Sequence, residues 1–263
     1  MNIIVCIKQV PASTKVRTDP ETGVFKADDT EDPIINPFDE YAIEEGIRLR
    51  EKHGGVVKII SMGPARAEKA IRTAIAMGAD EGYLAMDQAF DGSDTWATAY
   101  TLAAAVKKTG AFDIIICGKQ TMDSDTAQVG PGIAEMLDIP FITYIRKIRE
   151  IKDSVITVER MAENGFTVVQ MPLPGLITVV KEINEPRLAS LKGIMKSKKT
   201  EIKKMAAQDL GVDKEKTGLY GSGAWVLRTA TPQKRTGGEK ITGELPVLVE
   251  KLSSTIINLK LIK

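Results

Sequence analysis

The sequence is poor in the residues that build metal centres, disulfide frameworks and hydrolytic sites. It has two cysteines, Cys6 and Cys117, and one histidine, His53, among 263 residues. Each cysteine sits in an apolar run that predicts a strand, so we expect two buried free thiols. His53 ends a helical pattern just before two glycines, where a solvated imidazole is ordinary. A zinc site and a Ser-His-Asp or Cys-His arrangement are not expected, and the sequence predicts no catalytic and no metal-binding residue.

Charge of one sign and long apolar runs are also lacking. Thirty-six Lys and Arg residues balance thirty-five Asp and Glu residues, so the overall charge implies no strongly acidic or basic partner. The longest apolar runs, such as 114–117 and 176–180, are far too short to cross a bilayer. A strand is predicted almost from Asn2, with no secretory leader pattern before it. We therefore expect a soluble, cytoplasmic protein without membrane insertion.

The glycine fingerprints of common nucleotide-binding proteins are missing as well. Neither a Gly-x-Gly-x-x-Gly motif nor a P-loop occurs anywhere in the chain. A conventional Rossmann dehydrogenase and an NTPase are therefore disfavoured.

What is present is an alternation of short apolar runs with helical patterns over the first two thirds of the chain. The runs predict strands, and the stretches between them carry helix starts such as Asn36-Pro37 and Asp94-Thr95. Strands are predicted at 2–10, 56–61, 81–86 and 112–117, and helices at 37–53, 65–77, 95–108 and 131–137. This order predicts an α/β fold with an open, mostly parallel sheet and helices on both faces.

After Pro140 the pattern changes. Strand-like pieces at 141–151, 154–160 and 166–171, separated by short turns, predict a few antiparallel edge strands, and 172–181 adds one more short strand. Residues 18–30 are expected to form an excursion or loose hairpin outside the core, and 244–258 a final amphipathic helix. We predict a compact nucleotide-binding domain over 1–183 and an extended C-terminal arm over 184–263.

Three loops follow predicted parallel strands at 8–12, 62–65 and 118–130, where an open sheet binds its ligands. The last loop is the richest in polar side chains, and the helix after it begins with amides that have no internal acceptor, which favours a phosphate. Asp123 and Asp125 would repel a phosphate, so we expect them to hold ribose hydroxyls or to cap amides. An ordinary polar loop is the alternative. A nucleotide site without acid–base machinery indicates a cofactor holder.

Six segments of the chain resemble the beta subunits of electron-transfer flavoproteins, in the right order over nearly the whole length. They begin at Val5 (VCIKQVP), Asn36 (NPFDEYAIEE), Met62 (MGPARAEKAIRTAIAMGADEGY), Gly118 (GKQTMDSDTAQVGP), Asn184 (NEPRLASLKGIMKSKK) and Pro232 (PQKRTGG). The resemblance implies a nucleotide-binding α/β domain paired with an alpha subunit that carries its own FAD. The arm after residue 184 would pack on that subunit.

The family holds one of two nucleotides in this subunit. The common type binds a structural AMP and usually has Asn and Thr where this chain has Ala127 and Val129, whereas the electron-bifurcating type binds a second FAD. The pattern over 118–131 and the segment 92–98 resemble the bifurcating type. The resemblance therefore implies FAD, with AMP as the alternative, bound by Cys6, Lys8, Asn36, Met62, Gly63, Pro64, Thr95, Thr98, Gly118, Thr121, Asp123, Ser124, Asp125, Thr126, Ala127, Gln128 and Val129.

In the bifurcating type, NADH gives a hydride to the beta-subunit FAD. One electron then passes to a low-potential acceptor such as ferredoxin, and the other passes through the alpha-subunit FAD to a flavin dehydrogenase of the acyl-CoA or 2-hydroxyacid (lactate) type. Some members run the reverse, confurcating direction. The alternatives are a non-bifurcating carrier with AMP and a non-redox module that binds an adenine nucleotide.

Six lysines gather between residues 192 and 204. Such a run suggests nucleic acid, but no aromatic residues lie among them for base stacking, so we expect no nucleic-acid partner. A solvated lysine face is the simplest alternative. The resemblance implies instead a recognition loop whose apolar tip, Leu191, Ile194 and Met195, docks on the partner dehydrogenase.

Overall fold

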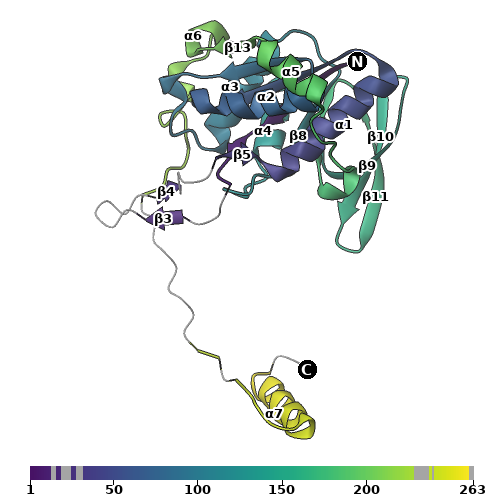
Figure 1. Cartoon of the computed structure of the whole chain (residues 1–263), viewed down its shortest axis with the longest axis vertical. Coiled ribbons are helices and arrows are strands. Elements are labelled where there is room, and N and C mark those ends of the chain that lie inside the picture. The colour runs from purple at the N-terminus through teal and green to yellow at the C-terminus, as the bar shows by residue number, and fades with distance from the viewer. Residues whose placement is uncertain (13–15, 19–24, 28–31, 228–236, 239, 261–263) are drawn as a thin grey trace. The chain divides into compact units, whose positions relative to one another are not determined.

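The computed structural model describes residues 1–12, 16–18, 25–27, 32–227, 237–238 and 240–260 (Figure 1). The chain forms two compact units, Met1–Arg228 and Thr229–Lys263. The sequence predicts a boundary after residue 183, whereas the first unit continues through residues 184–228. Most of the segment that begins at Pro232 lies outside the described residues.

A nine-stranded sheet forms the centre of the first unit, with strand order β11-β10-β9-β12-β8-β1-β6-β7-β13. Neighbours from β9 to β13 run parallel, and β10 and β11 are added antiparallel at one end (Figure 1). The predicted mixed α/β fold is thereby confirmed. The strands of the sheet are β1 Asn2–Ile7, β6 Val56–Met62, β7 Glu81–Ala85, β8 Ile114–Gly118, β9 Phe141–Lys152, β10 Val155–Ala162, β11 Gly165–Pro172, β12 Gly175–Val179 and β13 Ile202–Met205.

Two short antiparallel pairs lie outside this sheet. β2 (Gln9–Val10) pairs with β5 (Ile34–Ile35), and β3 (Val16–Thr18) pairs with β4 (Phe25–Ala27). The second pair is a hairpin of the kind predicted for 18–30, although most of that range lies outside the described residues.

Helices cover both faces of the sheet because apolar side chains are buried on both faces of its central strands. Ile3 and Val5 of β1 pack in one core cluster with α1 and α2, while Ile4 and Cys6 pack in the other with α3 and α4. Cys6 and Cys117 are register partners, and both are free and buried, as predicted. The helices are α1 Pro37–His53, α2 Glu68–Met77, α3 Thr95–Lys108, α4 Val129–Leu137, α5 Leu191–Lys199, α6 Ala207–Leu210 and α7 Leu245–Asn258, with short 3₁₀ turns η1 Ala65–Ala67, η2 Gln88–Phe90, η3 Lys181–Ile183 and η4 Lys214–Lys216.

Residues 184–228 contain elements that the sequence pattern does not reveal. β13 has two buried ends, Ile202 and Met205, with Lys203 and Lys204 exposed between them, so it lacks the alternation of a half-buried strand. α5 is short and mostly exposed, and so has no long apolar face. Among the described helices, none has the length and apolarity needed to cross a membrane.

Residues 184–187 are bound to α1 by an ion pair with a buried glutamate and by hydrogen bonds. Arg187 donates to Glu44 at 2.8 Å and to Glu51 at 2.6 Å, and the Glu44 side chain is only 3% exposed. Asn184 donates to the Tyr41 carbonyl and to Glu45 at 3.0 and 2.9 Å. These bonds explain why the compact unit extends beyond residue 183.

Helix α5 is in turn packed on α2, and the two lie side by side in Figure 1. A side chain at Gly193 would collide with the Ala76 carbonyl, so only glycine permits this approach. Arg72 of α2 donates to the Ser197 carbonyl, and Lys196 donates to the Ala79 carbonyl at 2.9 Å. The exposed side chains of α5 are therefore held on a fixed support.

We predict that Arg187→Ala lowers the free energy of unfolding by about 1–3 kcal/mol, because Glu44 stays buried with one cation fewer. Burial raises the pKa of Glu44, but hydrogen bonds from Arg187 and Arg48 outweigh it and hold the pKa below its ordinary value. That contribution is present above the unfolded-state pKa and is lost as pH falls through the folded-state pKa. The difference between wild type and variant should therefore shrink in acid, as measured by denaturant unfolding.

Arg48→Ala is the matched control, because Arg48 binds the same Glu44 at 2.8 Å but from within α1. It should cost less than about 1 kcal/mol. Limited proteolysis should show new cleavage near residues 184–200 only in Arg187→Ala. Equal losses of unfolding free energy in both variants would contradict the role of Arg187 in holding residues 184–187 on α1.

Candidate nucleotide-binding site

The strand order reverses at β1, which lies between β6 and β8. The chain proceeds from β1 to β6 and β7 on one side and then crosses to β8 on the other. In an open parallel sheet the crevice for a ligand opens at the carboxyl ends of the strands flanking such a reversal. Lys8 directly follows β1, and Gly118 ends β8. Two of the three predicted loops therefore meet at this crevice.

Asn36 joins these two loops. It is fully buried, and its backbone N–H donates to the Lys8 carbonyl at 2.9 Å. Its side chain donates to the Gln120 carbonyl at 2.8 Å and accepts the Met122 amide at 3.1 Å. Asn36 thus fixes the loop after β8 to the residue that follows β1.

The two loops are also joined by charge. Lys8 Nζ lies 2.5 Å from Asp123 Oδ2. Partial burial raises the pKa of Asp123, but hydrogen bonds from Lys8 and Thr121 outweigh it, so the pKa lies below its ordinary value. Asp125 accepts the Gln120 side chain, and the Thr121 and Ser124 hydroxyls lie 2.8 Å apart. Both aspartates have partners within the loops.

Helix α4 begins at the crevice. It starts at Val129, which agrees with the prediction from Pro131 that it begins no earlier than about Gln128. Gln128 provides no side-chain cap for the first turn, whose amides have no acceptor inside a helix. Asp125 and Ala127 have positive φ, 56° and 55°, a conformation that costs on the order of 1 kcal/mol in a residue with a side chain. The strained turn presents an uncapped helix N-terminus, which suits an anion.

Helix α3 brings the predicted segment 92–98 to the same place. Asp94 caps α3 by accepting the Trp96 and Ala97 amides. The Thr95 hydroxyl donates to Gln128 Oε1 at 2.9 Å, so the Gln128 side chain faces α3. Thr98 lies one turn further along the helix, its amide bonded to the Asp94 carbonyl.

The third loop lies on the other side of β1. Met62 ends β6, Gly63 and Pro64 follow, and the Gln9 side chain donates to the Arg66 carbonyl at 3.0 Å. The Cys6 side chain is packed in the core cluster of α3 and α4. It therefore offers the crevice only its backbone.

The predicted docking residues belong to another part of the first unit. Leu191, Ile194 and Met195 lie on α5 and are 77%, 39% and 56% exposed. They take no part in the crevice.

Asp39 is a residue of the crevice that the sequence analysis does not single out. It lies in the first turn of α1 and is 4% exposed. Burial raises its pKa to about 7, against the opposing effect of hydrogen bonds from the Lys8 amide, the Asn36 side chain and the Gly118 amide. An acidic residue in a helix's first turn is common, so the pattern alone gives no sign of this role.

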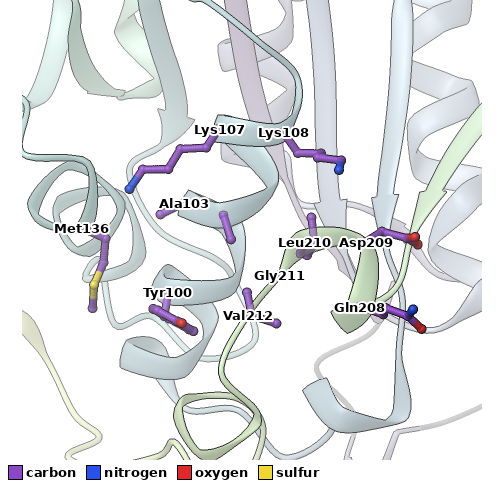
Figure 2. Close-up of a pocket in the computed structure, with 11 residues that line it drawn as sticks. Tyr100, Ala103, Lys107, Lys108, Met136, Gln208, Asp209, Leu210, Gly211 and Val212 are labelled. Carbon is purple, nitrogen blue, oxygen red and sulfur yellow. The ribbon is translucent and has the colours of Figure 1, made fainter.

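A separate cavity of about 530 Å³ lies between α3, α6 and Met136 of α4 (Figure 2). Its walls include Ala103 and Leu210, and no predicted site residue lines it. Figure 2 shows the Lys107 and Lys108 side chains pointing away from each other, so cationic groups do not converge in it. A binding site needs convergent polar groups, and Lys8, Asn36 and Asp123 supply them at the crevice.

A parallel sheet whose strand order reverses beside polar loops and an uncapped helix N-terminus is the arrangement of an α/β fold in which nucleotides commonly bind. The family described as "Electron transfer flavoprotein domain" matches residues 24–210. The chain belongs to the electron-transfer flavoprotein family and, by its relatives, to the beta subunits of that family.

Three relatives illustrate the range of the match. "Electron transfer flavoprotein subunit beta" of Thermoanaerobacterium thermosaccharolyticum is 50% identical over 253 residues, 96% of each chain. "Caffeyl-CoA reductase-Etf complex subunit CarD" of Acetobacterium woodii is 42% identical over 244 residues, 92% of each chain. "Protein FixA" of Azorhizobium caulinodans is 44% identical over 249 residues, 92% of this chain and 88% of FixA.

We predict that Lys8→Met raises the pKa of Asp123 and loosens the loop after β8, because the half-buried carboxylate loses its hydrogen-bonded cation. NMR titration of Asp123 and hydrogen exchange of the amides of 119–128 measure the two effects. Lys69→Met is the control, since it breaks only the exposed Lys69–Asp32 pair. An unchanged Asp123 titration in Lys8→Met would show that the ion pair does not organise the loop.

Proposed function

We propose that this chain is the beta subunit of a heterodimeric electron-transfer flavoprotein that binds FAD in the crevice between β1 and β8. In this proposal it takes part in electron bifurcation or confurcation between NAD(H), ferredoxin and a partner flavin dehydrogenase. The observation that carries the proposal is the crevice itself, where a strained polar turn leads into the uncapped N-terminus of α4.

The residues of the crevice suit a dinucleotide. The diphosphate would lie against the first amides of α4, with the Thr126 hydroxyl and the Gln128 side chain beside it. Lys8 already neutralises Asp123, which reduces the repulsion of a phosphate. Ala127 and Val129 are small or apolar and add no polar group. When bound, FAD supplies the redox chemistry, and the chain binds and orients it.

The name of the CarD relative, a subunit of a caffeyl-CoA reductase-Etf complex, supports a role beside a flavin dehydrogenase. For this chain we propose a dehydrogenase of the acyl-CoA or 2-hydroxyacid type. We propose α5 as its docking element, because Leu191, Ile194 and Met195 are exposed apolar side chains on a helix fixed to α2. Rigid, exposed apolar anchors are typical of recognition surfaces.

The alpha subunit is the proposed partner of the second unit. Helix α7 exposes Leu245, Val247, Val249, Leu252 and Ile257, which are between 53% and 71% exposed. Apolar surface of this kind marks an interface rather than a solvated helix.

Nucleotide content tests the proposal directly. The purified heterodimer should release two FAD on denaturation, one from each subunit. If the heterodimer releases one FAD and one AMP, the bifurcating function is rejected. The chain would then be part of a non-bifurcating electron carrier.

We predict that the double variant Thr126→Val, Gln128→Ala loses the beta-subunit FAD and retains the alpha-subunit FAD, which is bound by another chain. Each lost hydrogen bond to a charged group costs about 1.5–3 kcal/mol. Reduction of ferredoxin driven by NADH should disappear with the beta-subunit FAD. The control is Thr73→Val, Gln88→Ala, which changes the same residue types at exposed positions on α2 and η2. Full FAD content in the first variant would remove these residues from the site.

We also predict that Leu191→Ala, Ile194→Ala and Met195→Ala each weaken electron transfer to the dehydrogenase, by about 1–3 kcal/mol in affinity. Flavin content and heterodimer stability should not change, since α5 is remote from the crevice. Val168→Ala, at a 43% exposed position on β11, is the control. Unchanged steady-state transfer kinetics in all three variants would exclude α5 as the docking element.

A further inference from the structure

The hydrogen-bond ladder between β1 and β8 ends where the crevice begins. Its last register pair is Cys6 with Cys117. Gly118 ends β8, and Lys8 directly follows β1. A group that binds both residues would add a link between the two strand ends.

The Asp39 carboxylate fills that place. Its Oδ2 accepts the Lys8 amide at 2.7 Å. Its Oδ1 lies so close to Gly118 that any side chain at that position would collide with it, and the Gly118 amide also bonds to the carboxylate. Asp39 is itself fixed, because its amide donates to the Asn36 carbonyl at 2.8 Å in the first turn of α1.

We propose that Asp39 is a positioning residue of the crevice: its buried carboxylate holds the backbone N–H groups of Lys8 and Gly118 and so sets the separation of the two strand ends between which the nucleotide binds. This inference rests on the proposed nucleotide function and adds to it a residue that touches the protein's own backbone rather than the ligand.

The ionisation state of Asp39 matters for this role. A carboxylate accepts on both oxygens, whereas a carboxylic acid or an amide turns a donor toward one of the two N–H groups. Burial raises the pKa of Asp39 to about 7, so both states are populated near neutral pH. The titratable and charged groups around it are Lys8 and Cys6 from β1, Cys117 from β8, Lys119 and Asp123 from the loop after β8, and Glu40 from α1.

The hydrogen bonds of Asp39 determine how nucleotide affinity changes with pH. As pH rises through the pKa of Asp39, the carboxylate forms, both N–H groups are held and the crevice binds more tightly. The stability of the fold changes in the opposite sense, because a raised carboxyl pKa means that ionisation costs folding free energy. Nucleotide affinity and protein stability should thus move in opposite directions with pH, which a purely structural role of Asp39 would not produce.

The test compares wild type with Asp39→Asn in the heterodimer, with the alpha-subunit FAD in place and the beta site stripped. FAD and AMP are titrated separately at about pH 6 and about pH 8, on either side of the pKa. Asn mimics the acid, so the variant should match wild type at the lower pH and bind about 5-fold to 10-fold more weakly at the higher pH. Because the two proteins are compared at the same pH, the effect of nucleotide ionisation on affinity is the same for both. Hydrogen exchange at the Lys8 and Gly118 amides should be faster in the nucleotide-free variant at the higher pH.

Glu45→Gln is the matched control. Glu45 lies on the same helix, is buried, and has a pKa that burial also raises, but it bonds to Asn184 and not to the crevice. Its variant should follow wild type at both pH values. Equal affinities of wild type and Asp39→Asn at both pH values, or the same loss in Glu45→Gln, would overturn the inference while leaving the proposed function intact. A wild-type heterodimer whose beta site binds neither FAD nor AMP would overturn both.

Discussion

The structure depends on the burial of β1 on both faces and along both edges. Its isoleucines and Val5 pack under helices on either side, and its backbone is paired with β6 and β8. A strand confined in this way can meet solvent and ligand only at its ends. The reversal of strand order at β1 then separates the loops at its carboxyl end, and the polar groups of Lys8, Asn36 and Asp123 gather there.

Much of this arrangement can be predicted from the sequence, because it depends on local residue patterns. The isoleucine-rich strands, the Asn36-Pro37 start of α1 and the capping by Asp94 each depend on residues that are near in sequence. The start of α4 follows from Pro131 alone. By contrast, α5 and β13 are stabilised by contacts with α2 and β7, which are distant in the chain, and their own residues carry little periodicity.

The candidate site shows the same division. The sequence predicts that the loops at 8–12 and 118–130 lie together, because parallel strands share an edge, and the Lys8–Asp123 and Asn36–Gln120 bonds join them. It does not predict the bond of Thr95 to Gln128 or the burial of Asp39 against Gly118, because each depends on the distance between separate elements. Residue propensities describe the local structure that a residue favours, whereas the roles of Thr95 and Asp39 depend on the elements packed around them.

The short strand β13 also bears on how the protein avoids self-association. An edge strand offers unpaired backbone groups to the strands of other molecules, and lysines on such a strand discourage that pairing. β13 is four residues long, and its two exposed side chains, Lys203 and Lys204, are engaged with Glu81 and Glu68. Part of the lysine-rich stretch that by composition resembles a nucleic-acid contact thus lies on the edge strand of the sheet, where lysines disfavour the addition of a further strand.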